Sequence, residues 1–319
     1  MDDLPLEGRM SQGTTAFMDA DEVRAALPMG TLITALQEAL RAGLDPEADP
    51  ARAVVPVEHG QLLLMPSHSF RHAGVKIATV APGNATLGLP RIQGSYLLLD
   101  ARTLTPLAVL DGVALTAIRT AAVSAAAADL LAVPEAERLV VFGTGPQAHS
   151  HIEALCTVRE LRHITVVGRD PARLANFLRQ YGDSGPAVEA GTPDAVDRAD
   201  LVACCTTART PLFDGSALPA HATVVAVGSH EPEAREVDDE TVRRSTVVVE
   251  ARGAALREAG DVIQAVASGA LDPDWLVGLA DLARGTVVAD GSRPRLFKSV
   301  GMAWEDLVAA GVAYDSRKG

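Results

Sequence analysis

The chain has 319 residues, of which 48% are hydrophobic, so it can bury a large core and is long enough for two domains. A formal net charge of −13 argues against nucleic acid and anionic membrane surfaces as partners. Only three cysteines are present, without metal-ligand spacing, which indicates a reducing compartment and no bound metal. The polar start does not resemble a signal peptide, and no uninterrupted apolar stretch is long enough to span a membrane, so we expect a cytoplasmic protein.

The first part of the chain changes from helical to strand periodicity. Residues 1–13 look like a loose tail, and apolar residues between Val23 and Leu40 recur with the spacing of one or two amphipathic helices. Five short β-like runs follow, separated by polar or glycine- and proline-containing turns: 53–57, 62–65, 75–80, 96–99 and 107–110. These runs predict a mixed sheet or half-barrel, with a hairpin connection at 100–103.

The second part of the chain alternates strands with helices. A long alanine-rich helix is expected at about 115–132. Continuous apolar runs at 139–142, 164–167, 201–205 and 224–227 are then interleaved with helices that begin near Pro146 and Pro171. This alternation predicts a Rossmann-type, doubly wound parallel sheet whose strands are covered on both faces. A final helix is expected at 297–307, with a glycine near its start.

A glycine turn follows the first strand of this second part. The sequence GTGPQA at 143–148 has one glycine for a tight turn and a second for close approach of a pyrophosphate. Phosphates bind the free N–H groups at the start of the helix that follows such a turn. The expected cofactor contacts here are Gly143, Thr144, Gly145, Pro146 and Gln147.

The end of the second strand indicates which nicotinamide cofactor is bound. An NAD site usually has an acidic residue there, whereas Gly168 occupies the position in this chain and Arg169 follows. We therefore expect NADPH, with NADH possible, and count Gly168, Arg169 and Asp170 among its contacts. Alternatively Arg169 is a solvated surface residue while Asp170 caps the next helix, and the two interpretations are compatible. Thr206 follows a later strand at its carboxyl end, where such sheets bind ligands.

Two cations lie in apolar segments of the first part. Lys76 is within a strand-like run, and Arg119 is on the alanine-rich helix. Isolated cations in such segments are costly unless they are paired. Their partner could be the carboxylate of an acidic substrate, or protein carboxylates such as Asp111 or Glu58; the residues alone leave both readings open.

Several blocks of the chain resemble a known family. They read VVPVEHGQLLLMPS, GVKIATV, GVALTAIRTAA, GTGPQA and FKSVGMAWEDL. From about residue 15 to the end, the chain resembles the ornithine cyclodeaminase/mu-crystallin family. The resemblance implies an α/β fold with a discontinuous α+β substrate domain, residues 1–127 and 297–319, which dimerises through its sheet. A nucleotide domain, residues 128–296, is inserted into it.

The same resemblance assigns further site residues. It implies that Arg52, Lys76 and Arg119 bind the substrate carboxylate, with Lys76 near the reacting centre. Val300 is expected on the substrate side. Arg91 matches a cofactor-contacting position at which the residue type differs from that of the family. The remaining expected cofactor contacts are Arg119, Val227, Gly228 and Ser299.

One position departs from the family pattern. His230 stands where cyclodeaminases and alanine dehydrogenases of the family have an aspartate. A histidine cannot supply a fixed negative charge, but it can donate the proton that imine reduction requires. The prediction is therefore a homodimeric NADPH-dependent reductase of cyclic ketimino acids, with Lys76 and His230 as catalytic residues. The alternatives are an ornithine cyclodeaminase with bound NAD, an alanine dehydrogenase, and an NADPH-binding protein without catalysis, like mu-crystallin.

Overall fold

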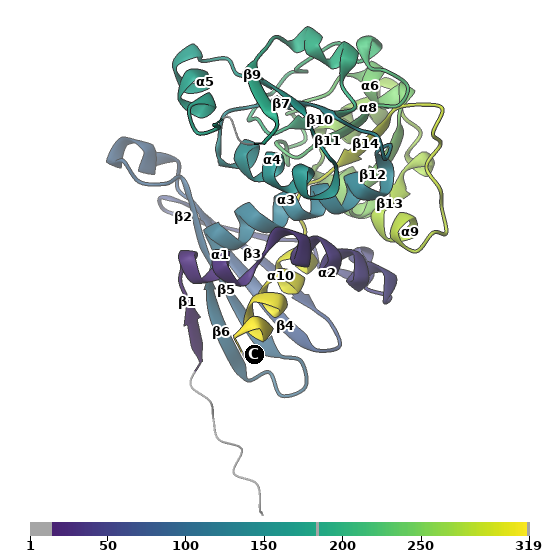
Figure 1. The fold of residues 1–319 in the computed structure, drawn as a ribbon. Coiled ribbons are helices and arrows are strands. Elements are labelled where there is room, and N and C mark those ends of the chain that lie inside the picture. The colour runs from purple at the N-terminus through teal and green to yellow at the C-terminus, as the bar shows by residue number, and fades with distance from the viewer. Residues whose placement is uncertain (1–14, 183–184, 318–319) are drawn as a thin grey trace, which may run out of the picture.

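The structure is a computed structural model that describes residues 15–182 and 185–317. The tail expected at 1–13 lies outside the described residues. Two sheets organise the chain, one above the other in Figure 1. The first has six strands in the order β1-β6-β5-β4-β3-β2, and the second has eight in the order β13-β12-β14-β11-β10-β7-β8-β9.

The six-stranded sheet is mixed. Its strands are β1 (Ala16–Met18), β2 (Ala53–Val57), β3 (Gly60–His68), β4 (His72–Val80), β5 (Ile92–Asp100) and β6 (Pro106–Asp111). Strand β1 pairs with β6 in parallel and the other neighbours are antiparallel. The predicted mixed sheet is confirmed, as is the hairpin, in which Asp100 accepts hydrogen bonds from the N–H groups of Arg102 and Thr103. Strand β1 was not predicted because three residues are too short to show a period.

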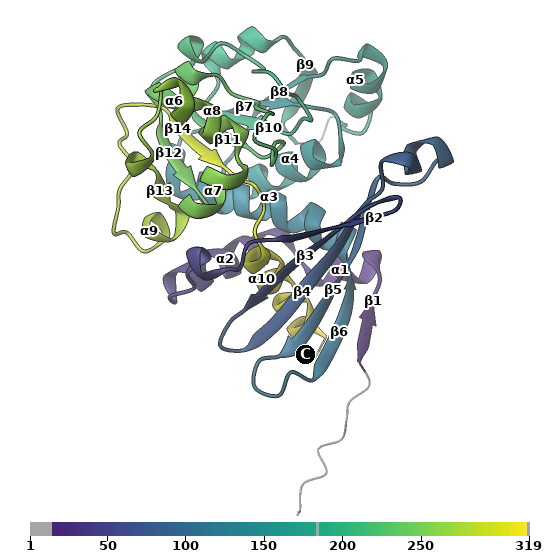
Figure 2. The same ribbon diagram turned by 180° about the vertical axis from the view of Figure 1, so that it is seen from behind.

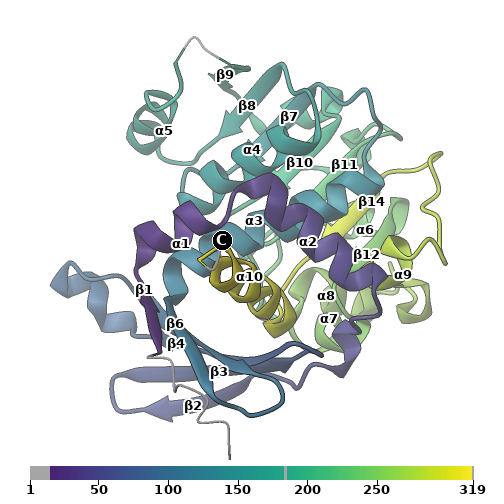
Figure 3. The ribbon, with the colours of Figure 1, turned by 60° about the horizontal axis from the view of Figure 1, so that its bottom comes forward.

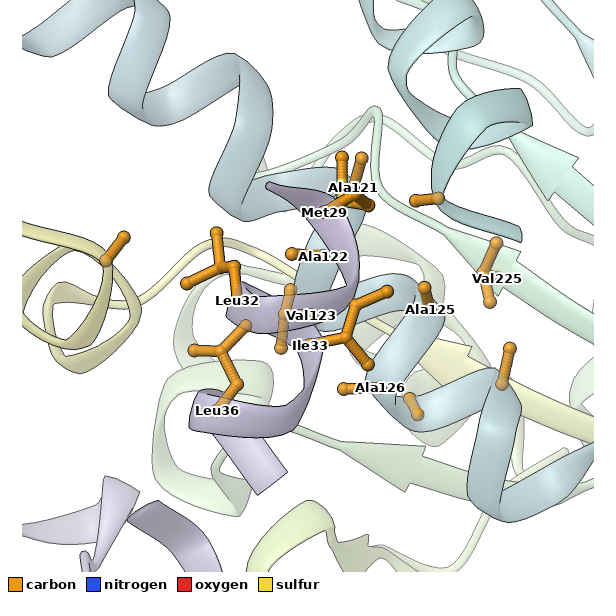
Figure 4. Close-up of a cluster of buried hydrophobic side chains, with 14 of the residues drawn as sticks. Met29, Leu32, Ile33, Leu36, Ala121, Ala122, Val123, Ala125, Ala126 and Val225 are labelled. Atoms are coloured by element: carbon orange, nitrogen blue, oxygen red, sulfur yellow. The ribbon is translucent and has the colours of Figure 1, made fainter. Parts of the chain in front are cut away.

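Four helices pack against this sheet or beside it. They are α1 (Ala20–Ala26), α2 (Met29–Arg41), α3 (Gly112–Leu131) and α10 (Ala303–Ser316). Although α10 is the last helix in sequence, it packs on β3, β4 and β5 (Figure 3). The apolar face of α2 meets the alanine-rich face of α3, so that Leu32, Ile33 and Leu36 lie against Ala122 and its neighbours (Figure 4). The alanines allow this close approach of the two helices.

The eight-stranded sheet is parallel throughout. Its strands are β7 (Arg138–Phe142), β8 (His163–Val167), β9 (Ala187–Ala190), β10 (Leu201–Cys204), β11 (Thr223–Ala226), β12 (Thr246–Val249), β13 (Val277–Gly278) and β14 (Arg295–Lys298). The helices between them are α4 (Pro146–Val158), α5 (Pro171–Leu178), α6 (Asp239–Arg244), α7 (Arg252–Glu258), α8 (Gly260–Ser268) and α9 (Leu279–Ala283). The predicted α/β class, with a Rossmann-type parallel sheet, is confirmed.

The helix predicted from Phe297 was wrong in its first part. Residues Arg295–Lys298 form β14 between β11 and β12, and α10 begins only at Ala303. The strand was not recognised because it contains two basic residues, which are unusual in a buried strand. In the structure both are buried and paired. Arg295 donates to the carbonyl of Leu131 at 2.8 Å, and Lys298 forms an ion pair with Asp261 at 3.0 Å.

Helix α3 connects the two sheets. It follows β6 directly and contacts β5 on one side and β11 and β14 on the other. Among the described residues it is the one helix that is long and apolar enough to cross a membrane by length and composition, and most of it is buried in the core of this fold. Helix α3 therefore lies at the junction of the two sheets.

Candidate active site

The glycine turn after β7 has the backbone that a dinucleotide site requires. Gly143 has φ +114°, and a Cβ there would lie 2.5 Å from the carbonyl oxygen of Cys205. Only glycine fits this position. Gly145 precedes α4, nothing lies within 4 Å of where its Cβ would be, and no described side chain caps the helix. Pro146 has no N–H and N of Ala148 donates to the carbonyl of Gly145 at 3.0 Å, so at the start of α4 the N–H of Gln147 is the one left available to an anion among the described residues.

A cleft of about 1030 Å³ opens at this turn. It is lined by the carboxyl ends of β7, β8 and β10, and by seven of the predicted cofactor contacts: Gly143, Thr144, Gly145, Gly168, Arg169, Asp170 and Thr206. Two further arginines, Arg173 and Arg209, line the same cleft. Three arginines around one cleft in a chain of net charge −13 favour an anionic ligand.

An acidic residue at the end of β8 would be crowded by neighbouring side chains. A Cβ at Gly168 would lie 2.9 Å from the Thr144 methyl group and 3.4 Å from the Cβ of Leu174. Asp170 caps α5 by accepting hydrogen bonds from the N–H groups of Ala172 and Arg173, as predicted, and Arg169 remains exposed at the cleft. Gly168 and Arg169 are consistent with a cofactor that bears an additional phosphate near the end of β8.

The other predicted cofactor contacts lie around the same end of the sheet. Pro146 is the first residue of α4, and the Oε1 atom of Gln147 is buried without a hydrogen-bond partner among the residues described. Val227 and Gly228 follow β11 directly. Arg119 is apart from these residues and does not line the cleft. A direct contact between Arg119 and the cofactor therefore remains a prediction.

Lys76 and Arg119 belong to a buried ion cluster at the start of α10. The Nζ atom of Lys76 lies 2.7 Å from Oδ2 of Asp306 and donates to Oγ1 of Thr116 at 3.4 Å. Arg119 donates from Nε to Oδ1 of Asp306 at 3.0 Å and from Nη1 to Glu305. All four charged side chains are at most 5% exposed. Strand β4, helix α3 and helix α10 thus contribute to one cluster.

Arg52 reaches the same place from the chain before β2. Its Nη2 atom lies 2.7 Å from a carboxylate oxygen of Glu258 and donates to the carbonyls of Val300 and Gly301 at 3.0 and 2.9 Å. Gly301 is in turn packed on the Arg119 guanidinium, because a Cβ there would lie 2.9 Å from it. The structure therefore brings Arg52, Lys76 and Arg119 together around residues 299–301.

A carboxylate of the parallel sheet binds the turn at 299–301. Glu250, which follows β12, accepts hydrogen bonds from Oγ of Ser299 at 2.6 Å and from N of Val300 at 2.8 Å. Gly301 has φ +76°, and its N–H also faces this carboxylate. Ser299 and Val300 thus lie at the junction of the two sheets, beside the cations expected to bind substrate.

Lys76 and Arg119 are paired with protein carboxylates, which was one of the two alternatives from the sequence, but the partners are not the two examples named there, Asp111 and Glu58. Asp111 caps α3 by accepting from N of Ala114 at 2.7 Å, and Glu58 is on the exposed turn between β2 and β3. The true partners, Glu305 and Asp306, stand in the FKSVGMAWEDL block, which we read only for its family resemblance. Two acidic residues at the start of an otherwise apolar helix were the signal that could have identified them.

Burial and the charges in the cluster shift the pKa values of its members. Burial lowers the pKa of Lys76 to about 8; Asp306 offsets part of this shift and Arg119 adds to it. Burial would also lower the pKa of Arg119, but Asp306 and Glu305 outweigh it and the net shift is upward. Burial and the proximity of Glu250 raise the pKa of Glu305 well above its usual range. Lys76 can therefore exchange a proton near neutral pH.

His230 is on the loop after β11 and faces several cations. The residue keeps an exposed surface, but the surrounding protein desolvates the imidazole. This desolvation, together with Arg52, Lys298 and Arg91, lowers the pKa of His230, and Glu231 acts in the opposite direction. The imidazole is thus mainly neutral at pH 7. Arg91, which precedes β5 and is exposed, therefore lies within electrostatic range of His230.

The two histidines of α4 have structural roles. His149 stacks on Phe177 at 3.9 Å between ring centroids. His151 is buried, its Nδ1 lies 2.8 Å from the carbonyl of Gln147, and burial lowers its pKa to about 4. In the part of the chain that the structure describes, no group of three or more His, Cys, Asp or Glu side chains could hold a metal ion.

The parallel sheet, its glycine turn and its cleft define a Rossmann-type nucleotide-binding protein. Residues 14–319 match the model of the ornithine cyclodeaminase/mu-crystallin family, and the chain belongs to this family. It is 36% identical to ketimine reductase mu-crystallin of Mus musculus over 94% of this chain and 97% of that one.

Two solved structures share the whole fold. One is Δ1-pyrroline-2-carboxylate reductase of Thermococcus litoralis in complex with NADH and L-proline, with a TM-score of 0.88 and 29% identity over 95% of this chain and 98% of that one. The other is an archaeal alanine dehydrogenase dimer with bound NAD, with a TM-score of 0.89 and 25% identity over 95% of this chain and 96% of that one.

Proposed function

We propose that the protein is an NADPH-dependent reductase of cyclic ketimino acids, the five- and six-membered imine 2-carboxylates. The product is a cyclic amino acid of the proline or pipecolate type. The observation that carries the proposal is the grouping of Arg52, Lys76 and Arg119 at the junction between the two sheets. The names of the mouse and Thermococcus relatives support the same reaction.

The cofactor fits the cleft beside α4. Its pyrophosphate matches the glycine turn and the uncapped helix start, where N–H groups favour an anion. We propose NADPH in preference to NADH, because the space that an acidic residue at position 168 would occupy is filled and Arg169 and Arg173 line the cleft nearby. When bound, the nicotinamide supplies the hydride for the imine carbon. NADH remains a usable second cofactor in this proposal.

The chain's own residues bind the substrate and supply the proton. Arg52 and Arg119 orient the carboxylate, because a guanidinium fixes direction as well as charge. Reduction of the imine requires a proton at nitrogen, and Lys76, with a pKa of about 8, is mainly protonated at neutral pH. The lowered pKa of His230 leaves only a small protonated fraction. We therefore assign the donation to Lys76 and to His230 the transfer of a proton from solvent.

Three other functions compete with this proposal. Ornithine cyclodeamination releases ammonia without net cofactor turnover, and His230 in place of an aspartate argues against it. Alanine dehydrogenation run towards alanine requires free ammonia. A non-catalytic protein of the mu-crystallin type binds NADPH without turning over any imino acid.

The assembly and the cellular location are further proposals. We propose a homodimer formed through the face of the six-stranded sheet opposite α10, over which Figure 2 shows no helix among the described residues. Val55 and Ile77 are exposed on this face of the sheet, and the archaeal neighbour is a dimer. Sedimentation of the wild-type protein and of Ile77→Lys tests this: a wild-type monomer would contradict it. We also propose the cytoplasm, where the three free cysteines remain reduced. We propose two domains divided at 127 and 297, positions that lie within α3 and β14.

The deciding experiment follows NADPH absorbance with pyrroline-2-carboxylate and piperideine-2-carboxylate, beside an ammonia assay with ornithine. Loss of NADPH with an imino acid, and no ammonia from ornithine, is the expected result. Ammonia from ornithine without net change in NADPH would replace the reductase by a cyclodeaminase. NADPH binding without turnover of any of these compounds would leave a binding protein.

A further inference from the structure

A buried carboxylate joins two loops that the proposed function uses. Both Thr206, on the loop after β10, and Gly228, on the loop after β11, donate to Glu236. The Oε1 atom of Glu236 accepts from N and Oγ1 of Thr206 at 2.8 and 2.7 Å. Its Oε2 atom accepts from N of Gly228 at 2.7 Å. Glu236 is 0% exposed, so its two oxygens make these bonds without competition from water.

The two loops touch directly where the carboxylate binds them. A Cβ at Gly228 would lie 1.9 Å from the carbonyl oxygen of Thr206 and 2.5 Å from Oε1 of Glu236. Glycine is therefore required at 228. The close contact also fixes the distance between the two loops. His230 follows Gly228 by two residues, so this spacing also sets the position of the imidazole relative to Thr206.

The buried ion pair of Asp261 and Lys298 holds the backbone at Glu236 in place. Oδ1 of Asp261 accepts hydrogen bonds from N of Glu236 at 2.6 Å and from N of Val237 at 2.9 Å. Lys298, at the end of β14, lies 3.0 Å from the other oxygen of Asp261 and donates to the carbonyl of Ser229 at 2.7 Å. The contacts close a ring from the Thr206 loop through Glu236, Asp261 and Lys298 to the His230 loop.

We propose that Glu236 is a positioning residue that sets the distance between the cofactor loop at Thr206 and the substrate loop at His230. This inference rests on the proposed function, in which the first loop contacts the nicotinamide cofactor and the second faces the imine. Hydride transfer depends on the approach of two reacting atoms, and a misplacement of about 1 Å can cost about 100-fold in rate. Glu236 acts through these loops and does not touch the substrate itself.

The test is Glu236→Gln, with Glu233→Gln as the matched control on the exposed part of the same loop. A glutamine keeps the shape, but its amide nitrogen can only donate and must face either the N–H of Gly228 or the two donors of Thr206. One loop therefore loses its acceptor. We expect kcat to fall by about 10- to 100-fold while the KM for the imino acid changes by less than about threefold. The deuterium isotope effect with 4-deuterated NADPH should increase, because hydride transfer becomes the slow step.

Hydrogen exchange supplies a readout that does not depend on turnover. In Glu236→Gln, exchange should rise in the segments 204–208 and 226–231, and in Glu233→Gln it should match the wild type. An unchanged kcat and isotope effect, or unchanged exchange in both segments, would overturn the proposal. If the glutamine variant does not fold, Glu236→Asp keeps the charge but shortens the reach, and the same losses are expected; wild-type behaviour of that variant would count against Glu236.

The wild-type protein separates this inference from the proposed function. A wild-type chain that reduces none of the imino acids refutes the function, whereas the exchange experiment still decides whether Glu236 holds the two loops together.

Discussion

Replacement of Arg169 by alanine tests the basis of the cofactor proposal. Arg169 is exposed at the edge of the cleft, so its truncation leaves the core intact. A hydrogen bond to a charged group contributes about 1.5–3 kcal/mol, and 1.4 kcal/mol corresponds to about a factor of ten in affinity. Loss of one arginine contact with the 2′-phosphate should therefore raise the Kd for NADPH by about 10- to 100-fold. The Kd for NADH, which lacks this phosphate, should change by less than about threefold, since no charged contact is lost.

The assay is fluorescence titration of both cofactors into wild type, Arg169→Ala and a control, Arg179→Ala. Arg179 is exposed at the end of α5, pairs with Asn176 and does not line the cleft. The control should bind both cofactors as the wild type does. Raised salt should reduce the difference between NADPH and NADH, because an exposed contact is screened. Equal weakening of NADPH and NADH by Arg169→Ala would refute the reasoning, since the phosphate is the only difference between them.

Four further results are expected. Arg119→Ala should raise the KM for the imino acid by about 10- to 100-fold and leave the Kd for NADPH nearly unchanged, as measured by initial rates and by titration; a collapse of NADPH binding would contradict the role given to Arg119. The same variant leaves Glu305 without its cation and Asp306 with Lys76 alone, so urea unfolding should show a loss of about 3–5 kcal/mol. Because the pKa of Lys76 is lowered to about 8 and its protonated form acts, kcat/KM should fall as pH rises through about 8, and a flat profile up to pH 10 would remove Lys76 as donor. Lys76→Met should lower kcat by about 100-fold or more and His230→Asn by less than about tenfold; the reverse order would make His230 the acid.

The strands and helices with clear periods could be predicted from the sequence. The apolar runs that became β7 and β10 are buried on both faces, so nothing interrupts their pattern. Several of the elements that were not predicted are short or charged. Strand β13 has two residues, and β14 contains Arg295 and Lys298, whose pairing depends on segments far away in the chain. No local pattern reveals that a charged side chain will be paired inside a core.

The candidate site, too, could be predicted only in part. The glycine turn was predictable because backbone geometry alone requires Gly143. The carboxylates that neutralise Lys76 and Arg119 were not, since Glu305 is 186 residues from Arg119 in sequence and meets it only through the packing of α10 on the first sheet. Glu236 escaped notice for a related reason: its importance lies in which N–H groups it faces, and the sequence does not show their direction.

The position of the neutralising carboxylates constrains the order in which the chain can fold during synthesis. Lys76 and Arg119 are translated early, and every strand of the parallel sheet is complete by residue 298. Until Glu305 and Asp306 emerge from the ribosome, two cations in apolar surroundings lack their counter-charges, which disfavours closure of that core. The nucleotide-binding half can thus form first, and the substrate half, although its strands are made earlier, is completed last.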